Sequence, residues 1–463
     1  MPRTPSTGST PRNDRRRWWW AFGLGLMSGA LVAALTSVLV WRVAGPRSPE
    51  PGDLLILTGR DDSEGQQRQF LIDLWNTANP GNQAKMISLS ETADAQYAEM
   101  VNRGEKNGKD DGTEIDVFNL DVTWTAAFAE KDLLRPIDEG GLADRPDEVF
   151  LKQPLRTCRY RDRLWALPFN TDAGLLYYRK GLGLKPPFDW PEIEAESARL
   201  LPRTPGLTAG YAGQLGDYEG LTVNALEALW AHGGDLRVDD QGNASIDPKR
   251  LAAALKPLTP SDAGPSVAFG EERGQQTEEQ SRQTFADGHV AFMRNWPVAY
   301  RKLTGDDATS GPSSAASKDT TAMTEAAKKV GVAALPGPSV LGGQNLAIAR
   351  QTGQPRAAQL LIEYLTGEQS QRTLFEKGGF AATRAVVYED VDIQNEYPYL
   401  PLLLEAIKTA RLRPVSPQYV NFSRVLRGYV GTVLDGKGSL PDDLAQRLTD
   451  ALHGKTPPSP APD

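Results

Sequence analysis

Short apolar runs alternate with amphipathic helical patterns along most of the chain. Runs such as DLLILT and EIDVFNL have the length of buried strands, and the segments after them repeat apolar residues at helical spacing. Strands that alternate with helices predict an α/β architecture, here with mostly parallel sheets. The expected strands are residues 53–58, 114–120, 164–169, 174–178, 331–335 and 345–349, and the expected helices include residues 123–130, 190–201, 220–232, 356–366 and most of the last hundred residues.

The first expected helix follows the first strand. Ser63 precedes it as a candidate N-cap, and Pro80-Gly81 ends it. Later in the chain, Asp189 stands in the same capping position before residues 190–201. The apolar spacing of the first helix predicts one buried face, made of Phe70, Leu71, Leu74 and Trp75.

The N-terminal segment has a different pattern, because residues 18–41 carry no charge. As a helix they would reach about 36 Å, enough to cross a bilayer, and tryptophans stand at both ends. Arginines precede the run, so the positive-inside rule leaves residues 1–17 in the cytoplasm and the remainder outside the cell. We expect a transmembrane anchor at residues 18–41, a linker at 42–52 and a disordered tail at 454–463. A cleaved signal peptide is the alternative.

Composition and charge exclude several classes of protein. Of the 463 residues, 51 are basic and 59 acidic, and a net charge of −8 without a basic stripe argues against nucleic acid as a partner. The single cysteine, Cys158, excludes an internal disulfide, and three dispersed histidines make a zinc site improbable. No nucleophile elbow, HExxH motif, phosphate loop or dinucleotide fingerprint is present, so no cofactor is expected.

The remaining residues suit the recognition of a neutral sugar. Aromatic rings cover the apolar face of a sugar, and acids, amides and arginines bond to its hydroxyl rim. Trp75 and Trp230 lie on apolar helical faces and are expected in the core. Trp296, between Arg294-Asn295 and Pro297, is expected to expose its ring, and Tyr218-Glu219 stands between glycine-containing turns.

Eight segments in this order resemble the extracellular solute-binding proteins of carbohydrate ABC transporters, in particular their trehalose- and maltose-binding branch. The resemblance spans about residues 53–453, nearly the whole part outside the predicted anchor. One departure is the absence of a lipid-carrying cysteine after the apolar helix. The segments are DLLILTG, EIDVFNLDVTWTAAFAEKDLLRPID, LWALPFNTDAGLLYYRKGL, PPFDWPEI, YEGLTVNALEALWAHGGD, FADGHVAFMRNWP, VGVAALPGPSVLGGQNLAIAR and RPVSPQYVNFSRVL.

The resemblance implies a two-lobed periplasmic-binding-protein type II fold with a sugar held between the lobes. Each lobe would be discontinuous, residues 53–168 with 332–363 forming the first and residues 174–330 with 366–453 the second. The hinge crossovers would lie at residues 168–173, at 331–336 and near 363–367.

The resemblance also implies the ligand contacts. Asp121 matches an acid of the first lobe that binds sugar hydroxyls, Asn170 and Asp172 match polar residues at the crossover, and Tyr218 and Glu219 match a segment of the second lobe. The remaining matches are Trp296 as the stacking ring, Gly342 and Gly343 as a close backbone approach, and Arg413, or alternatively Arg384, as a guanidinium fork for hydroxyls.

The function implied is the reversible capture of a di- or oligosaccharide, of maltose or trehalose type, for a membrane permease. The protein would be anchored in the cell membrane with its binding part outside. Two alternatives stay open at this point. One is a membrane-tethered sugar sensor, and the other is a glycoside hydrolase that uses Asp121 and Glu219 as its two carboxylates.

Overall fold

The computed structural model describes residues 49–61, 65–89, 92–106, 114–259, 276–304 and 329–455. The chain separates into residues 1–49 and a compact unit, Glu50–Asp463. The predicted cytoplasmic segment 1–17, the predicted anchor 18–41 and residues 456–463 of the predicted tail lie outside the described residues. Within the described ranges, no helix combines the length and the apolar character that a membrane crossing requires.

The first sheet has the strand order β2-β1-β3-β14-β4, with β7 also paired to β14. β1 is parallel to β2 and β3, whereas β14 is antiparallel to β3, β4 and β7. The prediction of mostly parallel sheets is therefore wrong, because β14 returns from the second sheet and enters from the opposite end. The strands are β1 Leu54–Thr58, β2 Ala84–Ser88, β3 Val117–Asp121, β4 Leu134–Arg135, β7 Ala166–Ala173 and β14 Leu341–Ala349.

The second sheet has the order β13-β8-β12-β9, with β12 parallel to β9 and antiparallel to β8. Both of its faces are buried. Leu176 and Tyr178 of β8 point into one hydrophobic core, and Leu175 and Tyr177 point into another, as the period of two in a strand requires. The strands are β8 Leu175–Arg179, β9 Ala209–Ala212, β12 Val290–Asn295 and β13 Val330–Ala333.

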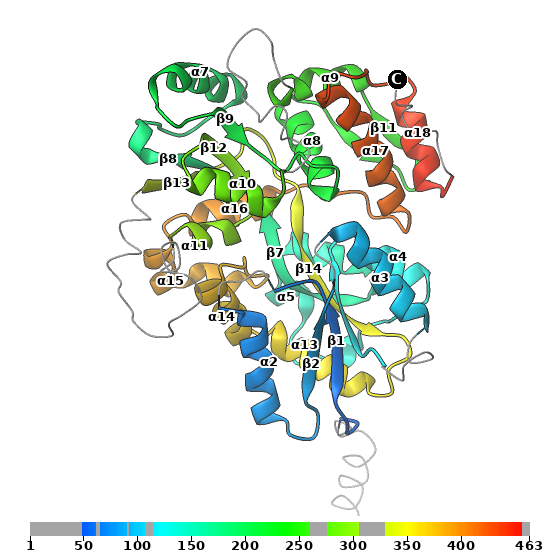
Figure 1. Cartoon of the computed structure of the whole chain (residues 1–463). Helices are drawn as coiled ribbons and strands as arrows, with labels where there is room; N and C mark the ends of the chain where they lie inside the picture. The colour runs from blue at the N-terminus through cyan, green and yellow to red at the C-terminus, as the bar shows by residue number, and fades with distance from the viewer. Residues whose placement is uncertain are drawn as a thin grey trace, which may run out of the picture. The chain divides into compact units, whose positions relative to one another are not determined.

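Helices cover both sheets (Figure 1). A core with Phe118, Phe128 and Leu361 lies under the first sheet. Two-stranded ribbons, β5 Arg159–Tyr160 with β6 Arg163–Leu164 and β10 Leu236–Val238 with β11 Ala244–Ile246, complete the described elements. The described helices are α2 Gln67–Ala78, α3 Ala93–Lys106, α4 Thr125–Glu130, α5 Pro146–Val149, α6 Lys152–Thr157, α7 Trp190–Leu200, α8 Glu219–Ala231, α9 Pro248–Leu255, α10 Glu278–Ala286, α11 Val298–Thr304, α13 Pro355–Leu365, α14 Glu368–Gly378, α15 Val391–Glu396, α16 Leu400–Thr409, α17 Tyr419–Leu434 and α18 Leu444–Leu452.

The local signals of the sequence succeed at α7 and fail in part at α2. Asp189 caps α7 as predicted. Its carboxylate accepts a hydrogen bond from the Glu192 amide at 2.8 Å, and the Glu192 carboxylate accepts one from the Asp189 amide at 2.9 Å. In α2, Leu71 and Trp75 are buried, but Phe70 and Leu74 are 39% and 46% exposed. The buried face is instead completed by Arg68 and Ile72, so the predicted face is rotated.

The chain passes between the sheets at three places. It leaves the first sheet at the end of β7 and enters the second at β8, with Gly174 between them. It returns through residues 334–340, between β13 and β14, and again passes between α13 and α14 at Thr366-Gly367. α14 lies at the junction, because Leu374 packs in the core of the first sheet and Phe375 in a core of the second.

The end of the predicted linker is part of the compact unit. Both backbone amides at the start of α13, those of Arg356 and Ala357, donate to the Glu50 carboxylate at 3.0 and 3.1 Å. The Gly52 amide bonds to the Gly81 carbonyl at 3.0 Å. An acid at a helix N-terminus is favoured by the unpaired amides there, so Glu50 fixes where the globular part begins.

Gly343 is required where β14 crosses β7. Its φ is +120°, and a Cβ there would stand 2.3 Å from the Asn170 carbonyl oxygen. We predict that Gly343→Ala lowers the free energy of unfolding by about 2 kcal/mol or more, because it adds backbone strain to a backbone clash. Urea denaturation measures this. Gly436→Ala is the matched control, since its φ is also positive but none of the described residues would lie within 4 Å of its Cβ. Equal losses in the two variants would contradict the clash.

Candidate functional site

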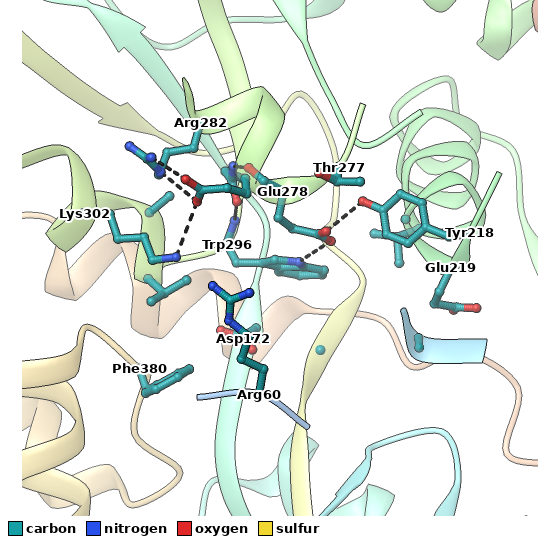
Figure 2. A pocket seen from close by; sticks show the side chains of 18 of the residues that line it. Arg60, Asp172, Tyr218, Glu219, Thr277, Glu278, Arg282, Trp296, Lys302 and Phe380 are labelled. Carbon is teal, nitrogen blue, oxygen red and sulfur yellow. Dashed lines mark hydrogen bonds and ion pairs between the residues drawn. The ribbon is translucent and has the colours of Figure 1, made fainter. Parts of the chain in front are cut away.

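A cavity of about 1440 Å³ opens between residues of the first and the second sheet (Figure 2). All nine residues predicted as ligand contacts line it, although they come from six separate stretches of the chain. Arg384, the alternative to Arg413, is not among them: it pairs with Asp144 at 2.9 Å and stacks over Phe150. The predicted residues on the wall are Asp121, Asn170, Asp172, Tyr218, Glu219, Trp296, Gly342, Gly343 and Arg413.

Two strands of the first sheet, β3 and β7, carry acidic and amide side chains to the cavity. Asp121 ends β3, and its Oδ1 accepts the Thr123 amide at 2.9 Å and the Thr123 hydroxyl at 2.7 Å. Asn170 and Asp172 both belong to β7 and lie two residues apart, so their side chains point to the same face. Asn170 therefore lies within a strand, and the expectation that it follows a strand's end is wrong.

Asn170 and Asp172 leave acceptor atoms unused. The Asn170 Nδ2 donates to Asp172 Oδ2 at 3.3 Å. Oδ1 of each residue is buried and, among the residues that the structure describes, meets no hydrogen-bond donor. Leaving a buried polar atom unpaired costs free energy, so such atoms mark a place where a ligand is expected to supply donors.

The Asp172 carboxyl has an unusual protonation equilibrium. Burial raises its pKa to about 7, and the carboxylates of Asp121 and Glu278 raise it as well. The guanidinium groups of Arg68 and Arg294 act in the opposite direction. Near neutral pH the group is thus present in both forms, as a carboxylate that accepts and as an acid that can donate.

On the second-sheet side, the Trp296 ring lies against the cationic side chain of Arg294. Trp296 directly follows β12, and the Arg294 guanidinium stacks on its ring at 3.7 Å from the centroid. Its indole Nε1 donates to Glu278 Oε1 at 3.3 Å, and the Tyr218 hydroxyl donates to Glu278 Oε2 at 2.8 Å. Figure 2 shows Glu278 reaching Trp296 and Tyr218 in this way. The ring is therefore held at one face and at its edge.

Arg294 is itself held by a buried ion pair. Its Nε and Nη2 donate to the two oxygens of Glu227 on α8, at 2.9 and 2.8 Å. Burial opposes the charge of Arg294, but Glu227 raises its pKa above the usual value. Glu227 Oε1 also accepts from the Ser339 hydroxyl at 3.1 Å and the Val340 amide at 3.0 Å, both in the return passage to β14. A Cβ on Gly174 would stand 2.7 Å from Arg294 Nη2.

Arg413 joins an acid from each side of the cavity. Its Nη1 donates to Glu219 at 2.6 Å, and its Nη2 lies 3.6 Å from Asp121 Oδ1 and donates to the Leu341 carbonyl at 3.3 Å. Glu219 also accepts from Tyr419 and, at 2.6 Å, from Ser423. The Nη1 and Nη2 groups are thus bonded to the protein, whereas Nε is buried and meets no acceptor among the described residues. Glu219 accepts from three protein donors.

The two glycines make room for protein atoms. A Cβ on Gly342 would lie 3.2 Å from both Asp172 Cβ and the Trp296 ring. At Gly343 the missing side chain accommodates the backbone of β7, as described above. The space expected for a ligand at these positions is thus taken in part by neighbouring residues.

Sequence reasoning missed Glu278. It stands beside Glu279 at the start of α10, and no local pattern distinguishes the two acids. In the structure Glu278 reaches Trp296 (Figure 2). Glu279 binds Arg282 and Lys302 instead. The direction of each side chain depends on where α10 packs, which only the tertiary structure decides.

Comparison with known proteins identifies the class of this two-sheet fold and its cavity. The chain belongs to the bacterial extracellular solute-binding proteins, whose family model matches residues 78–399. A probable ABC transporter-binding protein of Deinococcus radiodurans is 28% identical over 377 residues, which are 78% of this chain and 83% of that protein. Members of this family are binding proteins of transport systems, not enzymes.

Two solved structures are similar over nearly their whole length. Maltose-bound MalE3 of T. maritima has a TM-score of 0.74 and 26% identity, and the match covers 87% of this chain and 99% of that one. The GacH receptor of Streptomyces glaucescens, solved unliganded and with acarbose, has a TM-score of 0.70 and 23% identity over 88% and 100% of the two chains. The mixed α/β fold is thus that of the type II periplasmic-binding proteins.

The raised pKa of Asp172 makes stability depend on pH. Between an unfolded pKa of about 3.9 and the folded value of about 7, the native state binds more protons than the unfolded chain, so stability falls as pH rises across this window. We predict that Asp172→Asn removes this contribution. The variant should gain stability relative to the parent between pH 4 and pH 7 in urea denaturation. Asp73→Asn, at an exposed position of α2, is the control; a constant difference between the Asp172 variant and the parent would contradict the assignment.

Proposed function

We propose that the protein captures a neutral di- or oligosaccharide in this cavity, leaves it chemically unchanged, and presents it to the permease of an ABC transporter. The observation that carries the proposal is that one cavity holds both the Trp296 ring and the acceptor oxygens of Asn170 and Asp172 for which the described residues offer no donor. A ring backed by a cation on one face and buried acceptors together suit a ligand with an apolar face and a rim of hydroxyl donors.

The size of the cavity supports more than one sugar ring. Small-molecule sites usually enclose about 300–1,000 Å³, and this one is larger at about 1440 Å³. The T. maritima neighbour is bound to maltose, and the Deinococcus relative is a probable ABC transporter-binding protein. Both agree with a disaccharide or longer ligand and with delivery to a transporter.

The proposed lobes are residues 53–168 with 332–363 and residues 174–330 with 366–453. Asp121 would hold the sugar from the first lobe, and Asn170 and Asp172 would hold it from the crossover between the lobes. Trp296 would hold it from the second lobe, and Tyr218 would support Trp296 by way of Glu278. A ligand that bonds to both lobes stabilises their closed arrangement and shifts the population toward it. In this assignment Arg413 and Glu219 orient Asp121, and they contribute to the sugar site through it.

The proposed location is the outer face of the cell membrane, with residues 18–41 as a single membrane-spanning anchor. The extracellular character of the family supports a binding part outside the cell. The charge-free stretch between two groups of tryptophans and the arginines before it favour a retained helix. The linker would then end at Glu50, where the compact unit begins.

The contacts of Asp121 and Glu219 do not favour the pair of catalytic carboxylates that a glycosidase needs. Asp121 and Glu219 both face the Arg413 guanidinium, and Glu219 receives two further hydrogen bonds. A general acid must be free to reach the glycosidic oxygen, whereas Glu219 is held in place by these protein donors.

Calorimetry on the full-length protein, in a detergent without a sugar headgroup, tests the function. Maltose, maltotriose, trehalose and glucose are titrated in turn, and the sugar is analysed afterwards. We expect binding of at least one di- or oligosaccharide with no release of glucose. Release of glucose would indicate hydrolysis, and the absence of binding by every sugar would reject the proposal.

A single substitution tests the stacking ring. We predict that Trp296→Ala weakens the affinity for the bound sugar more than tenfold, because the apolar face of the sugar loses its partner while Arg294 loses its cover. Trp165→Ala is the matched control: this tryptophan is also half-buried but does not line the cavity. Calorimetry measures affinity, and thermal melting verifies that both variants fold. Unchanged affinity in Trp296→Ala would refute the stacking role.

A further inference from the structure

Arg427 connects the two sides of the cavity at its rim. It lies on α17, which packs against α8, α9 and α18 on the second-sheet side. Its Nη1 donates to Asp94 Oδ1 at 3.2 Å, and its Nη2 donates to Asp94 Oδ2. Asp94 lies in the first turn of α3, whose Met100 is part of the first-sheet core.

The contact has the geometry of a strong ion pair. A guanidinium that meets both oxygens of a carboxylate makes two charge-assisted hydrogen bonds with fixed direction. The Arg427 side chain is 9% exposed and Asp94 is 42% exposed, so water screens the pair less than it would on an open surface.

Arg427 is oriented from its own side before it reaches Asp94. Its Nε lies 3.2 Å from Asp217 Oδ1, just ahead of α8. Asp217 and Arg427 both belong to the second-sheet side, so separation of the sides would leave this bond in place and break only the bonds to Asp94. A preoriented side chain loses less entropy when the second contact forms.

We propose that Asp94 and Arg427 form a clasp that stabilises the closed arrangement of the two lobes and thereby raises the affinity for the captured ligand. The inference rests on the proposed function, since it assumes that the lobes separate to admit a ligand. Ala93, the neighbour of Asp94, lines the cavity, as do Asp217 and Tyr218, whereas Asp94 and Arg427 do not. The clasp therefore closes at the rim, outside the sugar contacts.

The clasp differs from the bridge made by Arg413. Arg413 lies on the cavity wall, and its approach to Asp121 at 3.6 Å is longer than its bond to Glu219. Replacing Arg413 would alter the proposed sugar site itself. Arg427 and Asp94 can be replaced without removing a proposed ligand contact, so their effect on affinity reports on the closed state.

The test is a double-mutant cycle of Arg427→Met and Asp94→Asn in the full-length protein, titrated with the sugar that binds the parent best. Each single variant is expected to weaken the affinity about five- to thirtyfold. The double variant should lose no more affinity than the single variant that loses the most. Raising the salt from 0.05 to 0.5 M should weaken binding in the parent and have less effect in the variants. Affinities within twofold of the parent would overturn the clasp.

Arg447→Met is the matched control. Arg447 lies on α18 and binds Asp443 at 2.7 Å and the Tyr429 hydroxyl at 2.7 Å, all on the second-sheet side. Its replacement should leave affinity and salt dependence unchanged, and a loss equal to that of Arg427→Met would also overturn the proposal. If Arg427→Met melts early, Asp94→Asn decides the result alone, because Asp94 is half-exposed and its loss removes little packing.

Small-angle scattering separates the clasp from the sugar assignment. If no sugar binds the parent, the proposed function fails, but the ligand-free proteins still test the clasp. Arg427→Met should then have a larger radius of gyration than the parent and Arg447→Met, because its lobes open more often. Equal radii in all three would overturn the clasp independently of the ligand.

Discussion

The site depends on the buried pair of Glu227 and Arg294. Burying a charge is costly unless it is paired and fully bonded, so this pair fixes its surroundings with little tolerance. On one side Arg294 supports the Trp296 ring. On the other, Glu227 bonds to Ser339 and Val340, where the chain returns to the first sheet. The stacking surface and one passage between the sheets are thereby built on the same interaction.

Around the Glu227–Arg294 pair, some polar groups of the cavity are bonded to protein, and others have acceptor atoms that meet no donor among the described residues. Glu219, Arg413 and Glu278 are bonded largely to protein, which gives them the character of supports. Asn170 and Asp172 retain acceptor atoms for which the described residues offer no donor. Binding without reaction follows naturally from this arrangement, because a reversible ligand needs open partners, whereas hydrolysis needs a positioned acid and a free carboxylate.

Much of the fold could be predicted from local pattern. Strands at 53–58 and 114–120, the helix after Asp189 and the burial of Trp75 and Trp230 are all confirmed, since each depends on short-range periodicity or capping. Sheet direction could not be predicted. β14 is antiparallel to its neighbours because it returns from another sheet, and nothing in its own nine residues encodes the end from which it enters.

For the candidate site, the sequence by itself determined which residue types are present. The resemblance of its segments to a protein family also gave nine positions, which the structure gathers on one cavity wall. Only the tertiary structure decided what each of them contacts. Glu278 and Glu279 are equivalent in the sequence, yet one reaches Trp296 and the other Arg282. Asp94 and Arg427 are 333 positions apart. Pairings of this kind arise from the packing of distant helices, and that packing is set by the cores of both sheets together.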